Sequence, residues 1–270
     1  MWLLVVVLGV LVLCCICIIN WINQGEEIVI VSSHYNEDLD WLKKSPWKVI
    51  VCDKPGASAS SFMPDLSCTL DVNRGREASS YLKYIVENYD NLPPKLAFIH
   101  GHEDAVHQNY PRGLLEAIKD AKTDKFDFIS LNNWIHLKKD ANTQPTLPNH
   151  PTSHKFEDHP KVYEEMRKTW PSVFEPIFGM KIPEYFRFDS SAQFIVSRKA
   201  IHRHGKDVYQ RLYEFMVDPH GDDWARGVIM EFTWHMLFTG SGPDVCNDPS
   251  DPDMYKNCTD EAYRSSRFNF

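Results

Sequence analysis

The sequence has no basic stretch. Its 29 Lys and Arg residues are outnumbered by 37 Asp and Glu residues, which gives a formal net charge of −8. Nucleic-acid-binding domains normally carry a basic patch or stripe, so nucleic acid is not an expected partner. The chain also has no internal repeats, and its 270 residues are enough for one large α/β domain.

Paired-cysteine zinc motifs are absent from the region that follows the N-terminal apolar run. Its four cysteines, Cys52, Cys68, Cys246 and Cys258, have no Cys-x-x-Cys spacing, so a structural zinc site is not expected. An even number of cysteines in such a region is typical of proteins from oxidising compartments. Disulfides Cys246–Cys258 and Cys52–Cys68 are therefore plausible.

Charged residues are missing from the N-terminus, where residues 2–19 form an unbroken apolar run. About 18 apolar residues are near the minimum for a helix that crosses a bilayer. No small-residue cleavage site follows, which favours an uncleaved signal anchor over a removed signal peptide. We expect residues 1–22 to be a transmembrane anchor and 23–270 a single domain. We therefore expect a type II membrane protein whose domain faces an ER- or Golgi-like lumen.

The pattern after residue 22 predicts alternating strands and helices. Apolar, β-branched runs predict buried strands at 27–33, 47–52, 96–99, 126–131 and 190–197. Helical patterns cover 73–86, 111–121, 162–169, 199–216 and 228–238. Such alternation is typical of a mainly parallel, Rossmann-like sheet flanked by helices. Residues 138–160 are polar and rich in Pro, His and Asn, and we expect them to form a long loop.

A cluster of histidines and acids follows the strand predicted at 96–99. His100, His102 and Asp104 alternate with Gly101 and Glu103, and open α/β sheets bind ligands at such strand ends. Imidazole and carboxylate groups that converge there would bind a divalent metal. One alternative is a solvated polar loop. Another is a zinc-dependent hydrolase with a His-x-His-x-Asp motif, although the further His that its signature requires is Ala105 here.

Two other segments carry candidate binding groups. Asn73, Arg74 and Arg76 open the helix predicted at 73–86, and guanidinium and free backbone N–H groups at a helix start suit a diphosphate. The alternative is a surface salt bridge made by Arg76. The segment His34-Tyr35-Asn36-Glu37-Asp38 follows the first strand, where an α/β sheet would bind a nucleotide.

A carboxylate and a histidine lie in the apolar helix predicted at 228–238. Glu231 and His235 are four residues apart and share a helix face. A carboxylate in so apolar a segment needs a partner or a function. Glu231 would act as a general base and His235 would bind a metal or phosphate oxygens. The alternative is a Glu–His pair that braces the helix.

These segments together resemble a family of domains of unknown function (3431) found in fungi and large algal viruses. The resemblance covers most of the chain after the anchor, and its layout is similar to that of GT-A-type nucleotide-sugar glycosyltransferases. The matching segments are 31–42, 73–78, 81–85, 88–93, 98–102, 192–197 and 231–238, the last with Glu231-x-x-Trp234-His235-x-x-Phe238.

The resemblance implies a glycosyltransferase that moves a sugar from a nucleotide-sugar donor to a hydroxyl of a glycan or glycoprotein. It also implies a divalent metal, Mn²⁺ with Mg²⁺ or Zn²⁺ as alternatives, although His100–Asp104 stands where such enzymes have Asp-x-Asp. A glycan-binding module without catalysis is a further alternative. The implied residues are Glu231 and Asp104 for catalysis; His34, Asn36, Glu37, Asp38, Asn73, Arg74, Arg76, Asp189, Gln193 and Trp234 for substrates; and His100, His102, Asp104 and His235 for the metal.

Overall fold

The structure is a computed structural model that describes residues 28–104, 112–132, 134–138, 153–155, 160–183, 185–189, 192–243 and 266–269. The expected anchor at residues 1–22 and the expected disulfide Cys246–Cys258 lie outside these ranges. None of the helices in the described ranges is long and apolar enough to span a bilayer.

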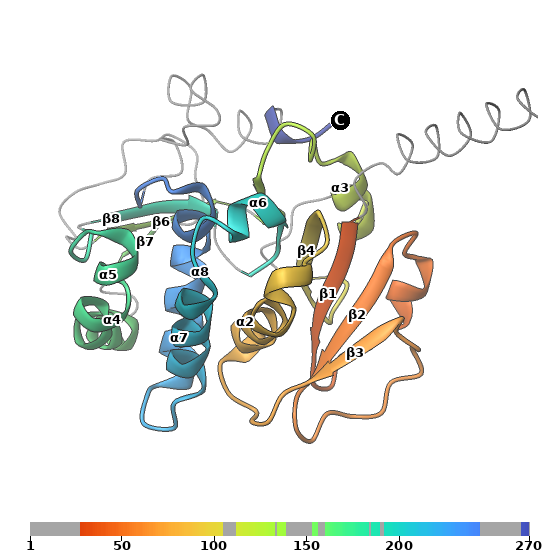
Figure 1. Cartoon of the computed structure of the whole chain (residues 1–270), viewed down its shortest axis with the longest axis horizontal. Helices are drawn as coiled ribbons and strands as arrows, with labels where there is room; N and C mark the ends of the chain where they lie inside the picture. The colour runs from red at the N-terminus through yellow and green to blue at the C-terminus, as the bar shows by residue number, and fades with distance from the viewer. Residues whose placement is uncertain are drawn as a thin grey trace, which may run out of the picture.

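A six-stranded sheet forms the centre of the fold, in the order β3-β2-β1-β4-β9-β5 (Figure 1). The first four strands run parallel, and β9 is antiparallel to both of its neighbours. The expected α/β sheet flanked by helices is therefore confirmed. The strands are β1 (Ile28–His34), β2 (Lys48–Asp53), β3 (Leu66–Thr69), β4 (Lys95–His100), β5 (Phe128–Ser130) and β9 (Phe194–Ser197).

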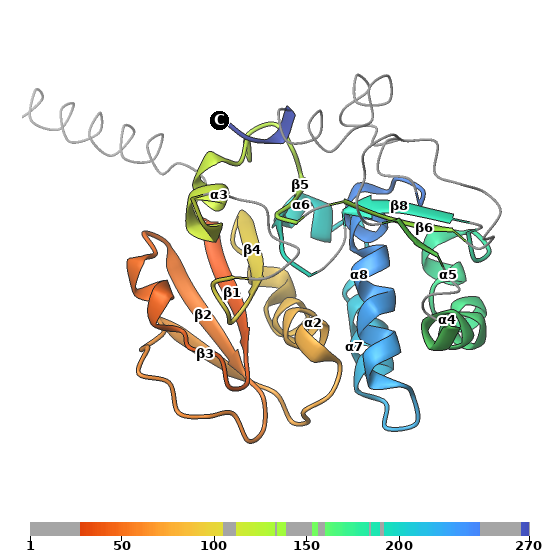
Figure 2. The ribbon, with the colours of Figure 1, turned by 180° about the vertical axis from the view of Figure 1, so that it is seen from behind.

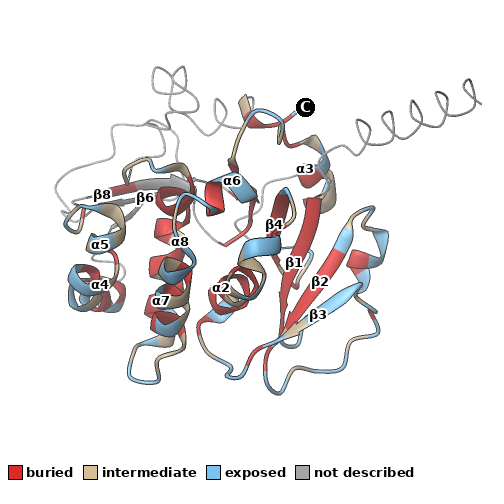
Figure 3. Ribbon diagram, in the orientation of Figure 1, coloured by how far each residue is buried: buried red, intermediate tan, exposed pale blue. Residues whose placement is uncertain are grey.

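Helices cover both faces of this sheet because its strands are apolar on both sides. In β1, Val29 and Val31 join the core beneath α2 (Arg76–Asn88), α7 (Lys206–Val217) and α8 (Asp223–Thr239). The alternate residues Ile28 and Ile30 pack toward η1 (Asp40–Lys44) and α3 (Leu114–Asp120). Figures 2 and 3 show the two helical layers and the buried strands between them. The remaining helices are η2 (Tyr89–Asn91), α4 (Pro160–Val173), α5 (Glu175–Phe178) and α6 (Arg198–Ile201).

A second sheet was not expected from the sequence. It has the order β7-β6-β8, with β6 (Trp134–Lys138) antiparallel to β8 (Tyr185–Asp189) and parallel to β7 (Ser153–Lys155). β7 lies in the segment expected to be loop. The single helix expected at 199–216 is also divided, since α6 ends at Ile201 and α7 begins only after Gly205.

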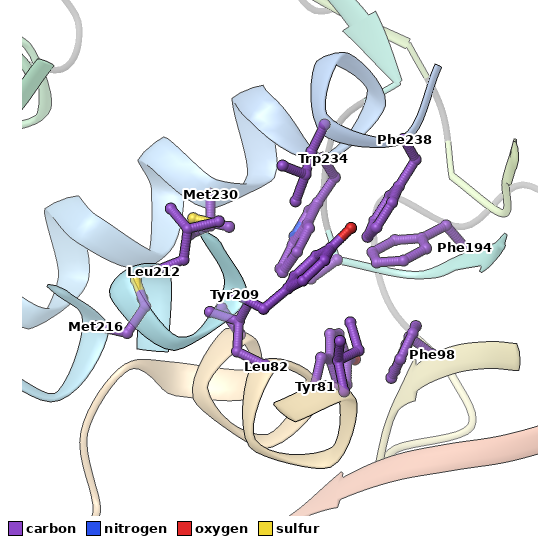
Figure 4. Close-up of a cluster of buried hydrophobic side chains, with 14 of the residues drawn as sticks. Tyr81, Leu82, Phe98, Phe194, Tyr209, Leu212, Met216, Met230, Trp234 and Phe238 are labelled. Atoms are coloured by element: carbon purple, nitrogen blue, oxygen red, sulfur yellow. The ribbon is translucent and has the colours of Figure 1, made fainter. Parts of the chain in front are cut away.

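An aromatic cluster fixes α2 and α8 against the sheet (Figure 4). Tyr81 of α2 lies with its ring 4.8 Å from that of Phe98 in β4, and Trp234 of α8 stacks on Phe238 at 5.8 Å. Phe194 of β9 contacts Phe98 and Trp234 at 5.4 and 5.2 Å. Because these rings are closely packed, α2 and α8 are held in fixed positions relative to β4 and β9.

The expected disulfide Cys52–Cys68 is present. The two residues are direct neighbours in the parallel β2–β3 pair, and the disulfide links the edge strand β3 to the sheet. β3 is not among the strands predicted from the sequence; it is short and mostly exposed.

Candidate functional site

A pocket of about 250 Å³ lies at the carboxyl ends of β1, β2 and β4. The chain leaves β1 toward β2 on one side and returns in β4 on the other, so the pocket is at a topological switch point. Parallel sheets open a ligand-binding crevice at such a point. The pocket is lined by Ser33, Tyr35, Glu37, Lys54, Asn73, Arg76, Glu77, His100, Gly101 and His102.

The loop after β1 is organised by the Glu37 carboxylate. Its Oε2 accepts the backbone N–H groups of Tyr35 at 2.6 Å and of Asn36 at 3.0 Å. Burial raises the pKa of Glu37, but these hydrogen bonds outweigh it and the pKa is lowered overall. Glu37 therefore lines the pocket as a fixed anion, while Asn36 and Asp38 are exposed beside it.

Glycine is required where β4 meets this loop. A Cβ on Gly101 would lie 2.9 Å from the Cβ of Glu37 and 2.9 Å from the carbonyl oxygen of Ser33. The buried Trp41 indole donates a hydrogen bond of 2.7 Å to the Gly101 carbonyl. The ends of β1 and β4 are thereby held in contact at the base of the pocket.

His100 and His102 face each other in the pocket, with His100 Nδ1 and His102 Nε2 3.1 Å apart. Burial, with the charges of His102 and Arg76, lowers the pKa of His100 to about 3. The backbone N–H of His100 donates to Gln193 Oε1 at 3.3 Å, and Gln193 is fully buried behind β4. Gln193, expected to bind substrate, thus supports the backbone of His100.

The side chains expected to bind a metal do not gather at one point. Across the described ranges, no three His, Cys, Asp or Glu side chains lie close enough to bind one ion. Asp104 lines a neighbouring pocket of about 470 Å³ with Asp38 and His102. His235 Nε2 lies 3.2 Å from the Gly242 carbonyl, beyond the end of α8. This set does not fit a metal site with three protein ligands, and the divalent metal stays a prediction.

Lys54, which sequence reasoning missed, directly follows β2. Its side chain lines the pocket and is only 7% exposed. Nζ donates one long hydrogen bond, 3.4 Å, to the Arg74 carbonyl, and it forms no salt bridge with any carboxylate in the described ranges. Burial lowers the pKa of this lysine, while Glu77 and Asp223 oppose the shift. Its position after a parallel strand was the available sequence signal.

The start of α2 has an unusual backbone. Gly75 has φ +76° and donates its N–H to Asp223 Oδ1 at 2.6 Å, and Arg76 has φ +46°. A positive φ is uncommon for an arginine and is found mainly at functional or structurally constrained positions. The Arg76 side chain packs against α8 at Gly227. A Cβ at Gly227 would lie only 2.5 Å from the Cδ of Arg76. This backbone and the absence of a side chain at Gly227 direct Arg76 into the pocket lining.

Arg74 has a different role from Arg76. Its guanidinium donates to the Gly221 carbonyl at 2.7 Å and so braces the loop before α8. It does not line the pocket, whereas Asn73 and Arg76 do.

The carboxyl group of Glu231 on α8 is affected by two side chains of α2 that line the pocket. Burial and the charge of Glu77 together raise the pKa of Glu231 to about 8, and the charge of Arg76 opposes them. Glu77 lines the pocket, and Tyr81 lies one helical turn after it. The Tyr81 hydroxyl is fully buried and has no hydrogen-bond partner in the described part of the chain. Burial and the charges of Glu77 and Glu231 raise its pKa.

Sequence reasoning found Glu231 but missed Glu77 and Tyr81. The i, i+4 spacing of the two missed residues on α2 was the available signal. A carboxyl group whose pKa is raised toward neutral pH, next to a second carboxyl group, is an arrangement suited to proton transfer.

His34 and Trp234, also expected in the site, lie outside the pocket lining. His34 is buried, and its Nδ1 is 2.7 Å from Asp53 Oδ1. Trp234 is buried in the aromatic cluster, and its Nε1 has no partner within the described ranges. Asp189 ends β8, and its side chain lies outside what the structure describes.

The structure is an α/β domain with a pocket at the carboxyl ends of its parallel strands, lined by the cations Lys54 and Arg76 and the carboxylates Glu37 and Glu77. The chain belongs to the family described as protein of unknown function (DUF3431), whose model matches residues 29–258. No curated protein matches it.

Proposed function

We propose that the protein is a glycosyltransferase that moves a sugar from a nucleotide-sugar donor to a glycan hydroxyl. One observation carries the proposal: Arg76 and Glu77, which line the pocket with Lys54, act electrostatically on Glu231, a carboxyl group with a raised pKa. Such a transfer needs positive groups at the leaving diphosphate and a base at the acceptor hydroxyl. The GT-A-like layout inferred from the sequence supports the same reaction by analogy.

The donor would lie across the ends of β1, β2 and β4. Arg76 and Asn73 would bind the diphosphate at the start of α2, where free backbone N–H groups also favour an anion. The Glu37 loop, with Asn36 and Asp38, would contact the nucleoside. No part of this assignment requires a metal at His100 and His102.

Glu231 would act as the general base. The acceptor oxygen attacks the anomeric carbon, and the bond from that carbon to the diphosphate oxygen breaks. The leaving nucleoside diphosphate keeps the electron pair, and the acceptor proton passes to Glu231. Because a base must be ionised, the raised pKa of Glu231 places its most effective range near or above pH 8. Asp104, in the adjoining pocket, would contact the transferred sugar or the acceptor.

The class of acceptor and the cellular compartment are proposed from the sequence. A signal anchor at residues 1–22 would place the domain in an ER- or Golgi-like lumen, where glycan and glycoprotein acceptors are available. The disulfide Cys52–Cys68 is consistent with an oxidising compartment.

The test is a donor and acceptor screen with full-length protein in detergent. Nucleotide sugars are paired with glycan acceptors, and release of nucleoside diphosphate is measured for the wild type and Glu231→Gln. Glu214→Gln is the matched control, since it makes the same change on the exposed face of α7. We expect release by the wild type and the control, and a loss of at least 100-fold in Glu231→Gln. Failure of every donor to exceed the Glu231→Gln background would refute the proposal.

The same screen distinguishes the two alternatives. Turnover of a phosphoester or carboxylic ester with zinc, and of no nucleotide sugar, would indicate the hydrolase. Glycan binding that Glu231→Gln leaves unchanged, with no turnover, would indicate a binding module.

A further inference from the structure

Lys54 is a buried cation that forms no ion pair in the described ranges, although Glu37 and Glu77 line the same pocket. Lysine is rarely buried unless it is paired, yet Lys54 is 7% exposed and forms no salt bridge within the described ranges. Its one hydrogen bond, to the Arg74 carbonyl, is 3.4 Å long and leaves the other ammonium donors for a ligand. Burying an unpaired charge is costly, so its presence at a pocket wall requires an explanation.

A second cation faces the same pocket. The Arg76 guanidinium makes no hydrogen bond and no ion pair with the described residues, although it lines the pocket and its backbone has φ +46°. The Arg76 charge repels that of Lys54 and helps burial to lower its pKa, while the charges of Glu77, Asp223 and Glu37 raise it. An anion bound between them would compensate both charges and remove this repulsion.

The two cations are fixed by separate elements. Lys54 follows directly after β2, and Arg76 opens the 13-residue helix α2. Cys52, two residues before Lys54, is held by its disulfide with Cys68. The backbone just before Arg76 is held by Asp223, which accepts a hydrogen bond from the Gly75 N–H. A site with pre-positioned charges loses little entropy when it binds its ligand.

We infer that Lys54 and Arg76 form a phosphate-binding cradle that holds the diphosphate of the donor directly, without a metal ion. The inference deepens the proposed function and rests on it, since it names the groups that bind the leaving diphosphate. It also agrees with the histidine and acid side chains, which do not form a set of three metal ligands in the described ranges. The pocket, at about 250 Å³, is smaller than the 300–1,000 Å³ of pockets that enclose a whole ligand. The pocket therefore accommodates the diphosphate, and the nucleoside and the sugar of the donor extend beyond the pocket.

The experiment measures binding of inorganic pyrophosphate and of nucleoside diphosphates by calorimetry, using full-length protein in detergent. Each titration is made in EDTA and again with Mn²⁺. The variant is Lys54→Met, which keeps the length of the side chain and removes its charge. The matched control is Lys48→Met, because Lys48 is exposed at the opposite end of the same strand β2.

We expect the wild type and Lys48→Met to bind in EDTA with equal affinity, and Lys54→Met to bind at least 10-fold more weakly. We also expect Lys54→Met to unfold at a higher temperature than the wild type without ligand, because an uncompensated buried charge has been removed. A lysine with a purely structural role would give the opposite change in melting temperature.

Each contrary result has a distinct meaning. Binding that occurs only with Mn²⁺ would overturn the inference and leave the glycosyltransferase proposal standing, with His100 and His102 as the metal-binding pair. Equal binding by Lys54→Met and Lys48→Met in EDTA would overturn the role of Lys54. Absence of diphosphate binding under both conditions would overturn the inference and the proposed donor class together.

Discussion

Replacing Glu231 by glutamine tests the electrostatics of the site without knowledge of any substrate. Glutamine has nearly the shape of a protonated glutamate and does not titrate. Since burial and Glu77 raise the pKa of Glu231 from 4.5 to about 8, the folded state favours its protonated form. The wild type keeps its full stability below about pH 4.5 and loses stability as the pH rises through about 8. The Glu231→Gln variant does not lose this stability, because glutamine does not ionise.

The size of the effect follows from the pKa shift. One pKa unit corresponds to about 1.4 kcal/mol. At pH 7 the ionisation of Glu231 in the unfolded state therefore favours unfolding by on the order of 3 kcal/mol, and above pH 8 by on the order of 5 kcal/mol. Whole domains are stable by only about 5–15 kcal/mol, so this difference is large enough to measure.

The assay is urea unfolding of the wild type and Glu231→Gln at several pH values from 5 to 9. We expect Glu231→Gln to gain stability relative to the wild type by about 3 kcal/mol between pH 5 and pH 7. Glu77→Gln removes a charge that raises the pKa of Glu231, so it should move the midpoint of this change toward acid. Glu214→Gln, on exposed surface, should follow the wild type. A stability difference between wild type and Glu231→Gln that is independent of pH would refute the reasoning.

Three further changes test the fold around the site. Replacing Cys52 and Cys68 by alanine opens a loop with a sequence separation of 16 residues, and should cost about 3 kcal/mol, or roughly 6–12 °C in melting temperature. An unchanged melting temperature would contradict the disulfide. Gly101→Ala should cost about 1–3 kcal/mol in urea unfolding, because its Cβ would lie 2.9 Å from two atoms of the β1 loop; a neutral effect would show that the contact relaxes. Phe98→Ala removes a fully buried ring of the aromatic cluster and should cost about 3–5 kcal/mol by the same measurement, whereas a loss below 1 kcal/mol would indicate loose packing.

Local pattern was enough to predict the central strands. The runs that form β1, β2 and β4 are continuous and β-branched or aliphatic, as strands buried on both faces require. The second sheet could not be predicted in this way. β6 pairs with β8, which lies about 50 residues later in the chain. Local periodicity carries no information about a pairing over that distance. The short strand β3 was missed because its residues are mostly exposed.

The location of the site was predictable, while the properties of its groups were not. Polar residues after β1 and β4 indicated the pocket, and His100, His102, Glu37 and Arg76 do line it. Whether the histidine pair binds a metal stays a prediction. Gln193 accepts a hydrogen bond from the backbone of His100, and its expected role in binding substrate stays a prediction.

By itself the sequence determined the buried strands of the central sheet and most of the helices, because apolar periodicity and β-branched runs act over a few residues. It also determined that polar groups gather at the carboxyl ends of parallel strands, and it contained the resemblance to the family. Only the tertiary structure decided that Lys54 is buried and forms no ion pair with the described residues, and that Glu231 is affected by Glu77, more than 150 positions earlier in the chain. Burial and the fields of neighbouring charges set the pKa of such groups, and both depend on which distant segments pack around them.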